Sequence, residues 1–222
     1  VQPAVLYGKM VGGGTAHFTA NYWRFREIDF VERTKLGTIS GTGFDDWPVT
    51  YSDLEPYYTK AEWELGVSGA PGPSDPPRSK PYPLPPLPIK SAGALLANGA
   101  RRLGWHSQPA PMAIISQPYR GRSACSHCGF CEGFGCEIKA KSSTLATVIP
   151  EAEKANVRFA LHPNDPPAPI SRGSEQMFAT FANWKRYLDL YKSPYNGITF
   201  DCGVTRELGE DPVAVCKYLG KR

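Results

Sequence analysis

The feature that most constrains this chain is a group of four cysteines, Cys125, Cys128, Cys131 and Cys136, which lie within a dozen residues. Small disulfide-bonded domains spread their cysteines along the chain, whereas thiolates spaced this closely can surround one soft metal centre. Iron–sulfur clusters use such runs, and zinc also accepts four thiolates in a tetrahedral site. The spacing therefore predicts a metal or iron–sulfur site, with reduced thiols or paired disulfides as the purely structural alternative.

The size and charge of the chain exclude several classes of function. Its 222 residues can bury one sizeable core or two small ones. The net charge is only +4, and acidic and basic residues are interleaved along the chain. This pattern lacks the basic stripe of a nucleic-acid-binding protein, so no nucleic-acid partner is expected. The longest apolar runs are a few residues, so no transmembrane segment is expected either.

Local patterns in the first two thirds of the chain predict two helices separated by an extended segment. Residues 51–65 have helical apolar spacing, with Ser52 as the expected N-cap, Glu55 as its capping-box partner and Gly66 as the stop signal. Residues 70–90 are crowded with proline, which excludes a helix or a central strand and favours an extended surface loop over a simple linker. Residues 91–103 follow as a helix, with their leucines expected on its buried side.

The sequence changes character near residue 156. Residues 157–162 and 198–202 are expected to be strands, and residues 175–190 and 211–219 are expected to be helices. The order strand, helix, strand, helix is the repeat of a parallel α/β fold. The fold class expected from the sequence is therefore a combination of α/β and α+β pieces.

A glycine run near the N-terminus begins the first set of motifs. Gly12, Gly13, Gly14 and Thr15 allow close backbone approach to a ligand, and their N–H groups suit an anion or the polar edge of a flavin, although a plain glycine turn has the same pattern. Further along the chain come Arg24, the sequence Asp46-Trp47-Pro48, the sequence Pro56-Tyr57-Tyr58 and the sequence Gly66-Val67-Ser68-Gly69. In this order, the motifs over residues 1–154 resemble the FAD-dependent glucose–methanol–choline (GMC) oxidoreductases.

The resemblance is to the branch with gluconate and fructose dehydrogenase flavoprotein subunits, and it carries several expectations. It implies part of an FAD-binding and substrate domain, with Gly12, Gly13, Gly14 and Thr15 against the FAD. It implies oxidation of CH–OH groups of a sugar or polyol substrate by hydride transfer to the flavin. At Cys125, Cys128, Cys131 and Cys136 it favours an iron–sulfur cluster over zinc, with a cytochrome subunit as the electron acceptor. The family's G-x-G-x-x-G motif and catalytic histidine pair are absent, so no catalytic residue is assigned.

A second set of motifs lies in the last third of the chain. His162 and Cys202 stand at the expected C-terminal ends of the two strands, where α/β folds build their active sites. From spacing alone, a buried histidine and a small buried thiol explain them equally well. However, the sequence His162-Pro163-Asn164-Asp165-Pro166-Pro167, the pair Arg172-Gly173, and the segments 193–197 and 200–203 together resemble mannonate dehydratase.

This second resemblance covers residues 155–222 and implies two βα units of a TIM barrel. It implies Mn(II)-dependent dehydration of D-mannonate, with His162 and Cys202 as metal ligands and Arg172 on a substrate loop. The sequence thus predicts two pieces, residues 1–154 and 155–222, joined end to end. Three functions follow: an FAD and iron–sulfur oxidoreductase that is incomplete in this chain, a fragment of a manganese-dependent lyase, or an inactive joined product. The first would be periplasmic and the second cytoplasmic.

Overall fold

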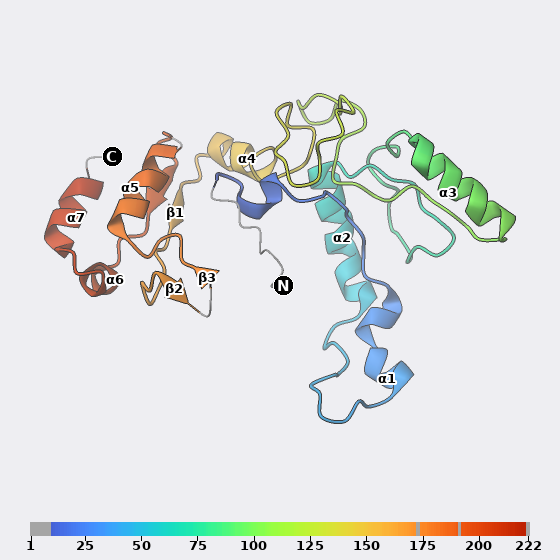
Figure 1. The fold of residues 1–222 in the computed structure, drawn as a ribbon, viewed down its shortest axis with the longest axis horizontal. Helices are drawn as coiled ribbons and strands as arrows, with labels where there is room; N and C mark the ends of the chain where they lie inside the picture. Colours follow the sequence, from blue (N-terminus) through green and yellow to red (C-terminus); the bar gives the residue numbers. More distant parts are fainter. Residues whose placement is uncertain (1–9, 172–173, 191, 221–222) are drawn as a thin grey trace. The chain divides into compact units, whose positions relative to one another are not determined.

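The computed structural model describes residues 10–171, 174–190 and 192–220. The chain divides into two compact units. One unit is Thr15–Thr147, and the other contains the described residues on either side of it, up to Gly14 and from Val148. Helices predominate in both, and each of the two small sheets has two strands (Figure 1). Among the described residues, no helix is both long and apolar enough to cross a membrane.

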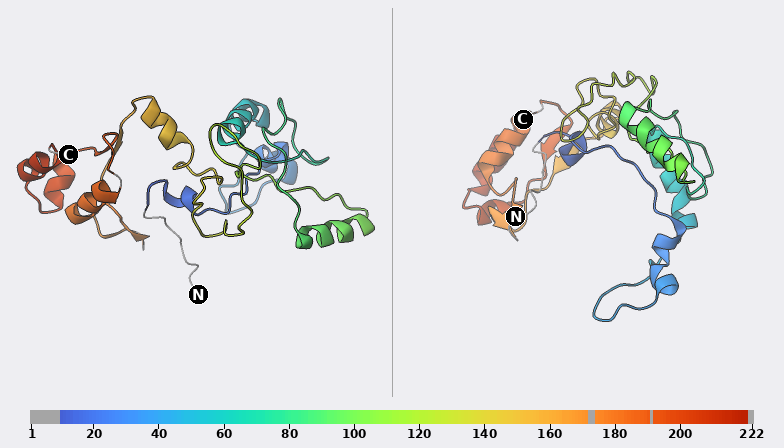
Figure 2. Two further views of the ribbon diagram at one scale, coloured as in Figure 1. Left: turned by 90° about the horizontal axis from the view of Figure 1, so that it is seen from above. Right: turned by 45° about the vertical axis from the view of Figure 1, so that its right-hand side comes forward.

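The unit Thr15–Thr147 holds its helices in an otherwise irregular chain. Its elements are the 3-10 helix η2 (Glu27–Phe30) and the helices α1 (Glu32–Leu36), α2 (Tyr51–Leu65) and α3 (Ser91–Arg102), and a further 3-10 helix, η1 (Gly13–Ala16), overlaps its start. Beyond α3, the chain up to Thr147 winds in loops (Figure 2). Isolated bridges such as Ser68–Met112 and Ile114–Lys141 join these loops to one another.

The cap of helix α2 lies two residues before the expected one. Its N-cap is Thr50, whose hydroxyl accepts a hydrogen bond from the N–H of Asp53, and the Asp53 carboxylate accepts one in return from the Thr50 N–H at 2.9 Å. The predicted cap at Ser52 is therefore wrong, because a capping box at Thr50 satisfies the free N–H groups first. The predicted stop at Gly66 is confirmed, since this residue ends the helix in the left-handed conformation with φ of 76°.

Helix α3 is present where the sequence predicts it, but its expected buried side is wrong. Leu95, Leu96 and Leu103 are 73%, 76% and 65% exposed, and no residue of the helix is buried. Figure 1 and the left view of Figure 2 show α3 standing apart from α2, and these leucines are largely exposed. The proline-rich segment before α3 contains neither a helix nor a ladder strand, as predicted.

Two adjoining apolar clusters form the core of the same unit. The first consists of Ala20, Val67, Ala113 and Ile114, and the second of Leu84, Ile115 and Ala140. Three of the four clustered cysteines pack against these residues: Cys125 against both clusters, Cys131 against the first and Cys136 against the second. The cysteine loop therefore lies directly on the core of its unit.

A buried ionic network fixes α2 within the unit. The guanidinium of Arg24 donates to the carboxylate of Glu62 through Nε at 2.8 Å and Nη2 at 2.7 Å, and Nη1 donates to Glu55 at 3.0 Å. Arg78 pairs with Glu62 Oε2, the oxygen that also accepts from Arg24 Nη2. Burial by itself lowers the pKa of Arg24, but the bonds to Glu62 and Tyr51 outweigh it and raise the pKa above its ordinary value.

The C-terminal unit combines short strands and helices. In chain order its elements are α4 (Val148–Lys154), β1 (Phe159–Leu161), β2 (Ile170–Ser171), β3 (Ser174–Glu175), α5 (Phe181–Leu190), β4 (Asn196–Ile198), α6 (Cys202–Glu207) and α7 (Pro212–Leu219). Strands β1 and β4 pair in parallel, with Phe159 opposite Asn196 and Leu161 opposite Ile198. The predicted parallel pairing is confirmed, and β2 pairs with β3 in an antiparallel arrangement that the sequence did not predict.

The second strand and its helix differ from the prediction in their bounds. Strand β4 ends at Ile198 because Asp201 caps the unpredicted helix α6, accepting a hydrogen bond from the N–H of Val204 at 2.9 Å. Buried Trp184, Val204 and Val215 form the core of this part of the chain, and they come from α5, α6 and α7. That these elements are two βα units of a TIM barrel stays a prediction, since two units of eight cannot close a barrel by themselves.

Candidate metal and cofactor sites

The four clustered cysteines lie in one loop that packs on the core of its unit. All four are free thiols; Cys125, Cys131 and Cys136 are half-buried and Cys128 is exposed. Burial raises the pKa of the Cys131 thiol above its ordinary value, and the nearby thiol of Cys125 raises it further, with smaller effects from the other two. The structure thus brings the four predicted residues within electrostatic range of one another.

Two backbone N–H groups donate to sulfur atoms of this loop. The N–H of His127 lies 3.3 Å from Cys125 Sγ, and the N–H of Lys141 lies 3.5 Å from Cys136 Sγ. Within the described residues, however, no three His, Cys, Asp or Glu side chains converge closely enough to hold a metal ion. The thiols would therefore have to draw together around a metal.

Lys141 is a residue of this site that sequence reasoning did not identify. Its side chain is buried, at 1% exposure, and Nζ donates to the carbonyls of Phe18 at 2.9 Å, Cys131 at 2.9 Å and Phe134 at 2.6 Å. Burial lowers the pKa of Lys141, and the thiols of Cys131 and Cys136 oppose that shift. The sequence signal for Lys141 was its position among the small residues Ala140, Ser142 and Ser143. The structure shows that these neighbours are buried as well.

The glycine run adopts a turn that leaves free space. Gly12 and Gly13 have φ of 93° and 53°, which only glycine adopts at ease, and the Gly13 N–H donates to the Met10 carbonyl at 2.9 Å. A Cβ added at Gly13 or Gly14 would meet nothing within 4 Å. The glycines are thus required by the backbone conformation, and contact of Gly12, Gly13, Gly14 and Thr15 with FAD stays a prediction.

Thr15, the last residue of that run, is held by the chain itself. Its Oγ1 accepts a hydrogen bond from the N–H of Thr144 at 3.0 Å and lies 3.1 Å from the hydroxyl of Thr144. Thr144 follows Lys141 by three residues, so the same short segment contacts both Thr15 and the cysteine loop. The segment from Lys141 to Thr144 is therefore in contact with both Thr15 and the cysteine loop.

The second candidate site lies at the ends of the parallel strands. His162 directly follows β1 and Asp201 follows β4, and their Nε2 and Oδ2 atoms are 3.5 Å apart. His162 Nδ1 lies 2.8 Å from the carbonyl of Pro163, which can only accept a hydrogen bond, so Nδ1 must carry the proton. Nε2 then faces the Asp201 carboxylate, as a donor in the charged ring or with its lone pair in the neutral ring, and in the neutral form the two atoms suit a shared cation.

Asp201, rather than Cys202, is the neighbour that the structure places beside His162. N–H groups of Val204 and Gly203, together with His162, lower the pKa of Asp201 below its ordinary value, with the Val204 N–H contributing most. Cys202 is the first residue of α6 and is exposed. The signal for Asp201 was its position at a strand end, which it shares with Cys202. Arg172, predicted on a substrate loop, lies outside the described residues.

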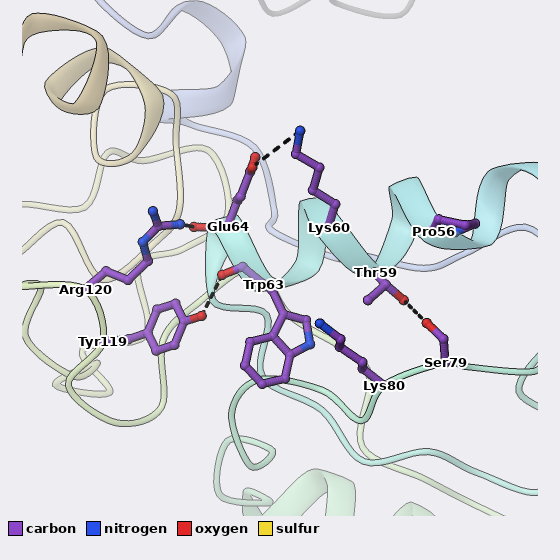
Figure 3. Close-up of a pocket in the computed structure, with 9 residues that line it drawn as sticks. All are labelled: Pro56, Thr59, Lys60, Trp63, Glu64, Ser79, Lys80, Tyr119 and Arg120. Atoms are coloured by element: carbon purple, nitrogen blue, oxygen red, sulfur yellow. Dashed lines mark hydrogen bonds and ion pairs between the residues drawn. The ribbon is translucent and has the colours of Figure 1, made fainter. Parts of the chain in front are cut away.

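An open pocket of about 620 Å³ lies along one side of α2, apart from these predicted residues (Figure 3). Lys60, Lys80 and Arg120 bring positive charge to it, and Trp63 and Tyr119 form its aromatic surface. The Tyr119 hydroxyl donates to the carbonyl of Trp63 at 2.6 Å. None of the residues predicted to bind a cofactor or metal lines this pocket.

Comparison with known proteins identifies the two regions separately. The N-terminal region is similar to GMC-type dehydrogenase flavoproteins, and residues 139–222 match the family model of D-mannonate dehydratase (UxuA). The fructose dehydrogenase large subunit of Gluconobacter japonicus is 38% identical over 155 residues, which is 68% of this chain and 27% of that protein. The gluconate 2-dehydrogenase flavoprotein of Pantoea cypripedii is 27% identical over 187 residues, 72% of this chain and 30% of that protein.

For the C-terminal region, the mannonate dehydratase of Enterococcus faecalis is 44% identical over 68 residues, 31% of this chain and 18% of that protein. Both resemblances predicted from the sequence are thereby confirmed. The chain spans about a quarter of the length of the dehydrogenases it matches and about a fifth of the dehydratases.

Proposed function

We propose that the N-terminal region functions in FAD-dependent oxidation of CH–OH groups of sugars or polyols, with an iron–sulfur centre at the cysteine loop. The observation that carries the proposal is that four free thiols lie in one loop, three of them packed on the core of the unit, beside the buried Lys141. Thiols, N–H donors to sulfur and a buried cation are together the chemistry that an anionic thiolate-bound centre requires. Similarity to fructose and gluconate dehydrogenases supports this reaction class.

In this proposal each motif of the N-terminal region has a separate task. Cys125, Cys128, Cys131 and Cys136 hold the iron–sulfur centre, which would pass electrons to a cytochrome subunit. Gly12 to Thr15 lie against the flavin, which when bound accepts the hydride from the substrate carbon. The chain's own part is to position these groups and to keep the cysteine loop on an apolar base.

The test is anaerobic reconstitution of the full chain with iron and sulfide, followed by iron and flavin analysis and a visible spectrum. A brown protein with stoichiometric iron is expected. Cys131→Ser should lose iron because this thiol is one of the predicted ligands and packs on the core, and Cys216→Ser, an exposed thiol on α7, should retain it. A colourless, iron-free chain would refute the centre and favour the inactive joined product. Bound zinc in place of iron would refute the electron-transfer role.

We also propose a manganese site for a mannonate dehydratase activity in the C-terminal region. The observation that favours it is the 3.5 Å approach of His162 Nε2 to Asp201 Oδ2, in a region that matches the D-mannonate dehydratase family model. Imidazole, carboxylate and the neighbouring thiol of Cys202 form a mixed donor set that suits a divalent transition metal. Bound manganese would supply Lewis acidity, while His162 and Asp201 would hold it at the strand ends, with Cys202 next in sequence as the further predicted ligand.

Manganese binding to the full chain tests this second proposal, measured by electron paramagnetic resonance of free Mn(II). The chain is expected to bind one Mn(II), and His162→Gln should weaken binding at least about tenfold, since removal of even an outer-shell partner has this effect. His106→Gln changes an exposed histidine of the other unit and serves as the control. Equal affinity of the two variants would show that His162 is not a ligand.

A further inference from the structure

We infer that Lys141 is the positioning residue of the cysteine centre, because its buried ammonium both anchors the loop and supplies the positive charge opposite a thiolate-bound cluster. The inference rests on the proposed iron–sulfur site. It goes further by assigning control of the charge and reduction potential of that site to a residue that binds no metal.

The anchoring follows from the three bonds of the ammonium group. Two of its acceptors, the carbonyls of Cys131 and Phe134, belong to the cysteine loop, and the third belongs to Phe18, from a distant part of the sequence. All three N–H donors of the lysine are therefore engaged, and they hold the loop to the segment around Phe18. The Phe18 ring adds a cation–π contact, with Nζ 5.7 Å from its centroid.

Lys141 differs from Arg24, another buried cation of this unit, in the groups that surround its charge. Arg24 is matched by the carboxylates of Glu62 and Glu55. Over the part of the chain that the structure describes, no ion pair joins Lys141 to a carboxylate, and its ammonium instead contacts carbonyls of the loop that carries the cysteines. Neutral thiols or disulfides would leave a buried charge without a counter-charge, which is costly. Thiolates around a metal centre provide that counter-charge.

A fixed positive charge beside a redox centre has a second effect. It stabilises the form that carries the additional electron, so the reduction potential of the centre should be higher with Lys141 than without it. A residue that only filled space or tied the loop would leave the potential unchanged. The potential therefore separates an electrostatic role from a merely structural one.

The experiment compares iron content and reduction potential of the reconstituted full chain with those of three variants. Lys141→Met removes the charge and the donors, Lys141→Gln keeps amide donors without the charge, and Lys139→Met removes the charge of an exposed lysine in the same segment. Both Lys141 variants should bind less iron, and at a fixed applied potential their ratio of reduced to oxidised centre should fall at least about tenfold. Lys139→Met should match the wild-type chain.

Equal potentials for the Lys141 variants and Lys139→Met would overturn the inference while leaving the iron–sulfur proposal intact. A wild-type chain that takes up no iron would instead refute the proposed centre itself. If the Lys141 variants do not fold, the inference can still be tested on the unaltered chain. The measurement is nuclear magnetic resonance of ¹⁵N-lysine-labelled protein with and without Zn(II). One slowly exchanging ammonium signal is expected, and it should shift when zinc occupies the thiols; zinc binding without a shift would overturn the inference.

Discussion

The two candidate sites of this chain are built in opposite ways. The cysteine loop lies on an apolar core, and a buried lysine holds it to a residue more than a hundred positions earlier in the sequence. The strand-end pair, His162 and Asp201, is exposed, and two adjacent parallel strands bring it together. The first site therefore depends on the folding of its whole unit, whereas the second depends on the register of β1 with β4. Disruption of one unit should leave the chemistry of the other in place.

The strongest test of that independence is Glu62→Gln, which leaves the buried Arg24 and Arg78 without their shared carboxylate. Loss of one partner of a buried ion pair costs about 3–5 kcal/mol. We expect this loss in the unfolding free energy of the unit Thr15–Thr147, measured in urea, together with loss of iron uptake. Manganese binding should persist. Glu64→Gln removes an exposed partner 3.9 Å from Lys60 and should cost less than about 1 kcal/mol.

The reciprocal test is Trp184→Ala in the core of the C-terminal unit. The indole is fully buried, and its N–H donates to the Phe178 carbonyl at 2.8 Å. Removal of so large a side chain costs about 3 kcal/mol or more, so manganese binding should fail while iron uptake remains normal. Val213→Ala, at a residue of α7 that is 59% exposed, is the matched control. If both metals were lost together, the two units would not be independent.

A smaller effect is expected at the end of α2. A Cβ at Gly66 would lie 2.7 Å from Tyr119 Cδ1 and 2.8 Å from Ile115 Cγ2, and the residue already has φ of 76°. Gly66→Ala should destabilise the unit by about 2 kcal/mol, from backbone strain and the clash together. Gly121→Ala has a similar φ of 77° but open space around its Cβ, so it should cost only about 1 kcal/mol. If Gly66→Ala and Gly121→Ala lost equal stability in thermal unfolding, the clash with Tyr119 and Ile115 would not contribute to the cost at Gly66.

The mildest test uses acid. Burial opposes ionisation of Glu55, but hydrogen bonds from Ser79, Thr59 and Arg24 outweigh it and hold its pKa at about 2, below the ordinary 4.5. Because the folded-state pKa is depressed, the ionised carboxylate contributes stability that is complete above pH 4.5 and is lost as the pH falls toward 2. The urea midpoint of the unit should fall within that window, and Glu55→Gln should show a shallower fall. If the urea midpoint of Glu55→Gln depended on pH as that of the wild-type chain does, Glu55 would not be the group responsible.

The local patterns of the chain were readable because they depend on neighbouring residues. Gly66 ends a helix through its own backbone freedom, and four cysteines within a dozen residues cannot lie far apart in any fold. The parallel pairing of β1 and β4 followed from the alternation of strand and helix patterns. The two family resemblances also rest on sequence alone, and the comparisons confirm them.

Other features were decided only in three dimensions. Leu95 and Leu96 form an apolar stripe that predicts burial, yet burial requires a partner surface, which local periodicity does not specify. Asp201 and Cys202 are neighbours in sequence, and only the strand ends and the cap of α6 place the carboxylate toward His162. Lys141 became a buried anchor because carbonyls from separate segments converge on its ammonium. Sequence thus determined which chemical groups are close along the chain, while tertiary packing decided which of them are buried, paired and charged.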